Sequence, residues 1–255
     1  MIRIAAVGDV HFGPDSAGTL ESHLAALAER ADVLLLAGDL TRFGHPEEAA
    51  VLAAELEGTP VPMIAVLGNH DYHQERESEI RRVLVDVGVQ VLEGDASVIS
   101  VNGSQLGVAG LKGFGGGFAG ACGADFGESV MKAFIRYTQE GAKRLEAALG
   151  AIADADVRVA LLHYAPITST LAGERLEIYP FLGSYLLAEA IDGAGADLVL
   201  HGHAHHGTEK GVTPGGIHVR NVAQPLIRRA FNLYCLDEAR VVHEPRDLET
   251  ASGRR

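Results

Sequence analysis

The sequence has few of the residues that mark a disulfide-stapled secreted domain or a nucleic-acid-binding surface. Its 255 residues include two cysteines, Cys122 and Cys235, which excludes a disulfide framework and favours free thiols in a reducing compartment. There are 21 Lys and Arg against 34 Asp and Glu, and the resulting net charge of −13 disfavours extended nucleic-acid binding. A small phosphorylated substrate stays open, because a bound metal could supply positive charge locally.

Long apolar runs are also missing. The longest, such as VLLLA at residues 33–37, are far too short to cross a bilayer. The first residues, MIRIAAVGDVHFG, lack the extended apolar core of a signal peptide and are typical of a first strand. We therefore expect a cytoplasmic protein without a membrane segment.

What the sequence does contain is an alternation of apolar strand-like runs with helical patterns. Strands are expected at residues 2–7, 33–37 and 63–67, and helices at 20–30, 46–57 and 75–87. This rhythm predicts a layered α/β fold with buried parallel strands. Asn102-Gly103 then predicts a hairpin turn between two strands. Further elements are expected as helices at 131–151 and 182–192, strands at 157–163 and 197–202, and short antiparallel strands within 207–243.

No linker or internal repeat divides the chain. We expect a single domain over residues 1–245 and a frayed tail over 246–255. Residues 110–127 are too glycine-rich for a packed element and predict a long loop. That loop could be a mobile flap over a site or a plain flexible insertion.

Polar side chains follow five of the predicted strands at the point where each strand ends. They are Asp9 and His11, Asp39, Asn69-His70-Asp71, His163, and the histidines of LHGHAHH at 200–206. Because sites in open α/β sheets form outside the carboxyl ends of the strands, these side chains should share one rim. Carboxylate, imidazole and amide oxygen are suitable ligands for Mn²⁺, Fe²⁺ or Zn²⁺. In Asp9-x-His11 and His203-x-His205, the spacing sends both side chains to the same side of the chain.

The set as a whole resembles the calcineurin-like metallophosphoesterase superfamily, and in particular its compact bacterial members. The resemblance spans residues 9–205, lacks no block of the family pattern, and rests on Asp9-x-His11, Gly38-Asp39, Gly68-Asn69-His70-Asp71, His163 and Gly202-His203-x-His205. It implies a four-layer α-β-β-α sandwich, in which two mixed sheets are flanked by helices. It also implies two divalent metal ions, such as Mn, Fe or Zn, between the loop ends.

The resemblance further implies a role for each site residue. Asp9, His11 and His205 would bind the first metal, Asn69, His163 and His203 the second, and Asp39 both. A hydroxide that bridges the ions would attack phosphorus. His70 would be catalytic, stabilising charge on the phosphoryl oxygens or protonating the leaving group. Asp71 would orient and charge His70, as carboxylates do for other histidines, and could also cap the following helix.

Other polar residues carry weaker hypotheses. His201 could support the ligands from behind, and His206 is expected to be exposed. Arg42 could hold a substrate phosphate, and Tyr164 could stack on a ring or fill a gap. His45, His73 and His218 could lie near the entrance. Gly115-x-Gly117-x-x-Gly120 formally matches a dinucleotide fingerprint, but it lacks the surrounding strand-turn-helix unit.

Phosphoester hydrolysis is the function that these residues favour. A phosphodiesterase for cyclic nucleotides or similar small diesters is the first expectation, and a phosphomonoesterase is the alternative. A non-catalytic protein-binding scaffold is a remote third reading, because all seven expected ligands and His70 are present. The expected partner is a small phosphorylated substrate. A homodimer through the C-terminal strands or the glycine-rich loop is also open.

Overall fold

Apolar, largely β-branched and leucine-rich strands build the first sheet of the computed structural model, which describes residues 1–236 and 242–243. Four of its strands are parallel neighbours: β1 (Ile2–Val7), β2 (Val33–Ala37), β3 (Met63–Val66) and β4 (Val89–Leu92). At the other side of β1 lie two antiparallel strands, β13 (Asn232–Leu236) and β14 (Val242–His243). Every residue of β2 is buried, because other layers cover both faces of the sheet.

The second sheet is also mixed. Its order is β11 (Lys210–Val212), β12 (His218–Asn221), β10 (Leu198–His201), β9 (Val157–Leu162), β6 (Ser104–Leu111) and β5 (Asp95–Val101). The four inner strands are parallel, and the two edge strands are antiparallel to their neighbours. The predicted hairpin between β5 and β6 is confirmed, with φ of 51° at Asn102 and 85° at Gly103.

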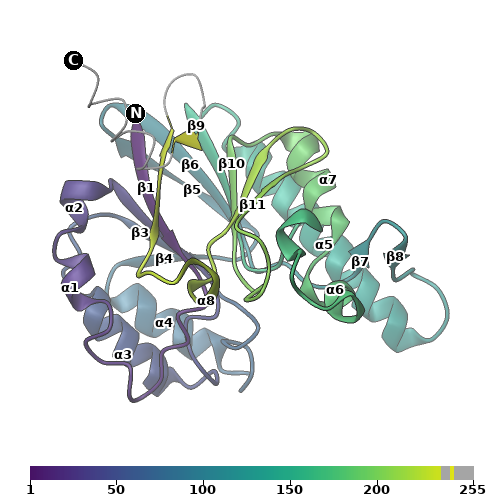
Figure 1. Cartoon of the computed structure of the whole chain (residues 1–255), viewed down its shortest axis with the longest axis horizontal. Coiled ribbons are helices and arrows are strands. Elements are labelled where there is room, and N and C mark those ends of the chain that lie inside the picture. Colours follow the sequence, from purple (N-terminus) through teal and green to yellow (C-terminus); the bar gives the residue numbers. More distant parts are fainter. Residues whose placement is uncertain (237–241, 244–255) are drawn as a thin grey trace.

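Helices cover the outer face of each sheet (Figure 1). The first sheet carries α1 (Glu21–Leu24), α2 (Leu27–Arg30), α3 (Pro46–Leu56) and α4 (Glu77–Asp86), and the second carries α5 (Ser129–Ala151) and α7 (Tyr185–Ala194). Side chains such as Ile4, Leu35, Val108 and Leu161 fill the space between the sheets. The predicted four-layer α-β-β-α sandwich is therefore confirmed.

Three expectations need correction. The helix expected over residues 20–30 is interrupted at Ala25–Ala26, although Leu20, Leu24 and Leu27 keep the buried face that predicted it. Not all C-terminal strands are antiparallel, since β12 pairs parallel with β10. The helix α8 (Gln224–Ile227) also interrupts that region.

The glycine-rich segment is packed over its first half, contrary to expectation. Residues 110–118 are buried apart from Phe114, which is partly exposed, and two short strands form a hairpin, β7 (Gly117–Phe118) with β8 (Ala121–Cys122). The predicted tail at 246–255 lies outside the described residues. Within the part of the chain that the structure describes, no helix is both long and apolar enough to cross a membrane.

The close approach of the two sheets at Gly110 gives a stability prediction. A Cβ at this position would lie 2.5 Å from Cβ of Leu92 and 3.0 Å from Cγ1 of Val66. Gly110→Val should therefore lower the free energy of unfolding by roughly 2 kcal/mol through overpacking. Urea denaturation measures the change.

Gly150→Ala is the matched control. Gly150 lies in α5 with open space around it, so alanine should raise the free energy of unfolding by roughly 0.5–1 kcal/mol. Unfolding of Gly110→Val at the same urea concentration as the unsubstituted protein would contradict this account of the sheet interface.

Candidate metal centre

The carboxyl ends of strands from both sheets meet at one rim. The first sheet contributes Asp9 and His11 after β1, Asp39 after β2, and Asn69 after β3. The second sheet contributes His163 after β9, and His203 and His205 after β10. The in-register pairing of β1 with β2 and of β2 with β3 aligns the ends of these strands. The structure thus brings all seven predicted ligands together.

Left-handed backbone turns aim these side chains at one point. Asp9, His11, Asp39 and His203 have φ of 56°, 44°, 49° and 69°. Non-glycine residues in this region cost on the order of 1 kcal/mol or more each, so surrounding contacts must hold them. The N–H of Asp9 donates to the carbonyl of Gly38 at 2.8 Å, and the N–H of His11 donates to that of Asp39 at 3.1 Å.

Two glycines leave room for the carboxylates. A Cβ on Gly68 would collide with Oδ1 of Asp39, and one on Gly202 would collide with Oδ2 of Asp9. Any larger residue at either position would displace a carboxylate that belongs to the cluster. The glycines of the GNHD and GHAH motifs are therefore required by the close approach of backbone to side chain.

The first group of converging atoms comes from Asp9, His11 and His205, whose ligand atoms lie within 4.8 Å of one another. Nε2 of His205 lies 2.9 Å from Oδ1 of Asp9 and 3.4 Å from Nε2 of His11. The carboxylate of Asp9 also accepts the N–H of His203 at 2.9 Å. This last bond connects the β1 loop of one sheet to the β10 loop of the other.

The second group comes from Asp39, His163 and His203, again within 4.8 Å. Nδ1–H of His163 donates to the carbonyl of Ala37 at 2.9 Å, so Nε2 is the atom that carries the lone pair when the ring is neutral. That Nε2 faces Oδ1 of Asn69 at 2.9 Å and Oδ1 of Asp39 at 3.3 Å. Nε2–H of His203 donates to the carbonyl of Phe181 at 3.3 Å, which leaves Nδ1 as its acceptor atom.

The carboxylate of Asp39 lies between the two groups. Its Oδ1 faces His163 at 3.3 Å, while its Oδ2 faces His11 at 3.8 Å. Oδ1 also accepts the backbone N–H of His70 at 2.8 Å, which fixes the orientation of the carboxylate. A single buried side chain thus presents one oxygen to each half of the cluster.

The electrostatics of the cluster favour a bound cation. Burial lowers the pKa of His11 to about 4 and that of His203 to about 3, so both rings are neutral at pH 7 and offer a lone pair. Burial, together with the charge of Asp9, raises the pKa of Asp39. Burial alone would also raise the pKa of Asp9, but the hydrogen bond from His205 and the nearby histidines hold it below its ordinary value.

The chemistry of these donor atoms fits a divalent metal ion. Nε2 of His163 and Oδ1 of Asp39 face each other at 3.3 Å, so the two atoms can bind one cation between them. Imidazole nitrogens with carboxylate and amide oxygens are ligands for borderline divalent ions. The contact of His163 with a backbone carbonyl is the arrangement that orients metal-binding histidines.

His70 lies on the open side of the cluster. Its side chain is 40% exposed, and its Nε2 lies 3.9 Å from Oδ2 of Asp39. Nδ1–H donates to the carbonyl of Arg42 at 2.6 Å. The ring meets that of His11 edge-on, with centroids 4.5 Å apart. Nε2 therefore points toward the cluster from the solvent side.

Asp71 has different partners from those expected. Its buried carboxylate accepts the N–H of Gly68 at 2.8 Å, the N–H of Thr41 at 2.8 Å and the hydroxyl of Thr41 at 2.6 Å. It also accepts the N–H of Leu40 at 3.2 Å. The expectation that Asp71 orients His70 is corrected here, since the carbonyl of Arg42 does so. Asp71 instead joins the β2 loop to the β3 loop.

The residues that carried weaker hypotheses lie in different surroundings. Tyr164 is buried, with its ring 4.3 Å from that of His203. Buried His201 contacts the hydroxyl of Thr170 at 2.8 Å and the carbonyl of Gly202 at 2.7 Å. His218 begins β12 at the end remote from the rim, which excludes the entrance position considered for it. His45 precedes α3, and its N–H donates to Glu48 at 3.3 Å. His73 and His206 are both exposed.

Arg42 lies beside the cluster. Its guanidinium packs on Gly13, two residues beyond His11, and forms an ion pair with Asp15 at 2.7 Å. A Cβ on Gly13 would come within 2.6 Å of Cζ of Arg42, so a larger residue there would move the guanidinium from its present position.

Lys112 is a residue that the sequence analysis missed. It follows β6, and its buried ammonium lies 4.9–5.5 Å from the ring centroids of Tyr72, Phe114, Tyr137 and Tyr164. Burial lowers the pKa of Lys112, although the charges of Glu93 and Asp39 act in the opposite direction. A polar residue directly after an apolar strand, as in VAGLKG, was the available signal.

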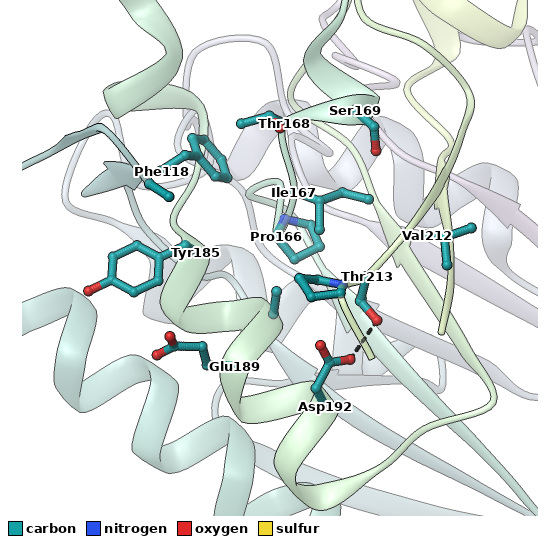
Figure 2. Close-up of a pocket in the computed structure, with 13 residues that line it drawn as sticks. Phe118, Pro166, Ile167, Thr168, Ser169, Tyr185, Glu189, Asp192, Val212 and Thr213 are labelled. Atoms are coloured by element: carbon teal, nitrogen blue, oxygen red, sulfur yellow. Dashed lines mark hydrogen bonds between the residues drawn. The ribbon is translucent and has the colours of Figure 1, made fainter. Parts of the chain in front are cut away.

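A cavity of about 730 Å³ lies away from this cluster (Figure 2). Side chains of α7, the loop after β9, and Val212 and Thr213 line it, and Asp192 accepts a hydrogen bond from Thr213 there. None of the predicted ligands is among its lining residues. The converging polar groups and the cavity are therefore separate features.

Comparison with solved structures shows the same fold in other proteins. A phosphopantetheinyl hydrolase from Mycobacterium tuberculosis aligns over 89% of this chain and 92% of its own, with a TM-score of 0.63 and 15% identity. The protein TT1561 of Thermus thermophilus aligns over 95% of this chain and 97% of its own, with a TM-score of 0.59 and 20% identity. A comparison with curated proteins gives no significant match.

The family comparison agrees with the residues of the cluster. The calcineurin-like phosphoesterase family matches residues 2–207, which include every predicted ligand from Asp9 to His205. The chain therefore belongs to the calcineurin-like phosphoesterase family and is a metal-dependent phosphoesterase.

Proposed function

We propose that this chain hydrolyses a small phosphodiester with two divalent metal ions. The observation that carries the proposal is the carboxylate of Asp39, which offers one oxygen to each of two groups of ligand atoms. Asp9, His11 and His205 would hold one ion, and Asn69, His163 and His203 the other. Mn²⁺, Fe and Zn²⁺ all suit this ligand set.

When bound, the metals supply Lewis-acid stabilisation of the phosphoryl group and lower the pKa of an attacking water. The chain itself supplies a proton donor and a positive charge at the rim. Nδ1–H of His70 is held by the carbonyl of Arg42, so its Nε2, when the ring carries a second proton, can donate to a phosphoryl oxygen or pass that proton to the departing alkoxide. The guanidinium of Arg42 can contact the phosphate from the side of Gly13.

Charge supports a diester over a monoester. A diester carries one negative charge at pH 7, whereas a monoester carries nearly two and needs more cationic contacts. Arg42 is already paired with Asp15, and the whole chain has a net charge of −13. Cyclic nucleotides and similar small diesters are accordingly the first candidates, and a phosphomonoester is the alternative.

The cytoplasm remains the predicted location of the protein.

Hydrolysis of bis-p-nitrophenyl phosphate against p-nitrophenyl phosphate tests the proposal. The protein is stripped with EDTA, and Mn²⁺ is then returned. We expect activity to vanish and to return with the metal, with a higher kcat/KM for the diester. Preference for the monoester would support the alternative. Full activity in the stripped protein would contradict a metal-dependent mechanism.

Two substitutions separate metal binding from proton transfer. Asp39→Ala should lose both metal content and activity, because it removes an oxygen from each group. His70→Ala should keep its metals and lose about 100-fold or more in kcat, the usual contribution of a positioned acid. Metal content by plasma mass spectrometry and steady-state kinetics measure the two effects.

His73→Ala is the matched control, since this exposed histidine lies three residues beyond His70. Its kcat should equal that of the unsubstituted protein. An unchanged kcat in His70→Ala with metal present would rule out the proposed role of His70.

We further propose that Asp71 positions the loops and does not act on the substrate. Asp71→Asn replaces an acceptor oxygen by an NH₂ group facing backbone N–H donors, which leaves buried groups unsatisfied. The free energy of unfolding should fall by about 2 kcal/mol. Exposed Asp86→Asn should leave it unchanged. Loss of kcat in Asp71→Asn without any loss of stability would instead favour a direct catalytic role.

A further inference from the structure

Exposed apolar side chains gather in the segment that precedes α7. The 3₁₀ helix Leu176–Ile178 and the helix α6 (Tyr179–Leu182) expose Leu176, Ile178 and Phe181 by 73%, 37% and 62%. Leaving such side chains in water sacrifices the free energy that burial would provide. Single exposed hydrophobic residues are common, but three within six residues indicate a surface that contacts something.

A second exposed apolar segment adjoins the first. Phe126, Val130 and Met131 are exposed by 82%, 79% and 47% just before and within the first turn of α5. Gly115 lies where the segments meet, because a Cβ there would be 3.2 Å from Cα of Phe181 and 3.3 Å from Cζ of Phe134 on α5. The N–H of Gly116 donates to the carbonyl of Pro180 at 2.7 Å. Figure 1 shows α6, the β7–β8 hairpin and the start of α5 side by side. We define the apolar rim surface as Phe126, Val130, Met131, Leu176, Ile178 and Phe181.

The apolar rim surface is continuous with the metal centre. The carbonyl of Phe181 accepts the Nε2–H of His203 at 3.3 Å, so a residue of this surface contacts a proposed ligand through its backbone. The surface therefore begins beside a proposed ligand of the second metal. Charges of both signs flank it, acidic at positions 125, 128, 174 and 177 and basic at positions 132, 136 and 175, so it lacks the basic cluster that an anionic membrane would attract.

We propose that the apolar rim surface binds an uncharged apolar group of the substrate, which makes the preferred substrate an amphiphilic phosphodiester. This inference rests on the proposed function, because the phosphodiester must occupy the metal centre. The phosphate would lie at the ligands, and the apolar ester group would extend over Phe181 toward Leu176 and the start of α5. The surface then selects among diesters by the apolar area that each one buries.

Two p-nitrophenyl diesters that differ only in chain length test the inference. The methyl and octyl esters of p-nitrophenyl phosphate are compared with the Mn²⁺-restored protein, below the concentration at which the octyl ester aggregates. Each methylene fully removed from water contributes roughly fourfold. On an open surface we expect kcat/KM for the octyl ester to exceed that for the methyl ester by about tenfold or more.

Phe181→Ser and Leu176→Ser should each reduce this ratio several-fold. Both side chains are exposed, and the contact of Phe181 with His203 uses a backbone atom, so folding should survive. Val98→Ser is the matched control, because Val98 is 50% exposed on the remote edge strand β5. It should leave the ratio unchanged.

The outcomes distinguish this inference from the proposed function. Hydrolysis of both esters at equal kcat/KM would overturn the inference and leave the phosphodiesterase proposal in place. Hydrolysis of neither ester would overturn both. Sedimentation at the assay concentration adds one more outcome. If the protein is a dimer that Phe181→Ser converts to monomers while the ratio stays the same, a second copy covers the surface and the inference is wrong.

Discussion

The placement of one buried carboxylate, that of Asp39, between two groups of ligand atoms is the constraint on which the rest of the site depends. Its oxygens face His163 from the second sheet and His11 from the first. For this to occur, parallel strands of both sheets must end at the same rim, and the sheets must face each other. The two-sheet sandwich is therefore the frame that sets the distance between the halves of the site.

Holding so many acceptor atoms together has a cost in stability. Four residues of the cluster adopt left-handed backbone, and three buried carboxylates, those of Asp9, Asp39 and Asp71, lie close together. Bonds between loops offset part of this cost. Asp71 accepts from the β2 and β3 loops, and Asp9 accepts from His203 of the other sheet. A bound cation would offset more, because metal binding then contributes to folding free energy.

Much of the fold and of the cluster could be predicted from the sequence. Alternating apolar runs predicted the strands, and polar residues directly after them predicted Asp9, Asp39, His163 and the histidines after β10, because strand ends share a rim. Contacts between distant segments could not be predicted in this way. Two partners of Asp71, Leu40 and Thr41, lie 31 and 30 residues away in another loop. Lys112 meets rings from three distant parts of the chain, and Phe181 contacts His203 through a backbone carbonyl. Such contacts depend on tertiary packing, which local spacing does not encode.

Anomalous diffraction from a crystal equilibrated with Mn²⁺ tests the central claim most directly. The account predicts two anomalous peaks, one bounded by Asp9, His11 and His205 and the other by Asn69, His163 and His203, with Asp39 between them. A single peak, or peaks that Asp39 does not contact, would contradict the proposed two-metal centre.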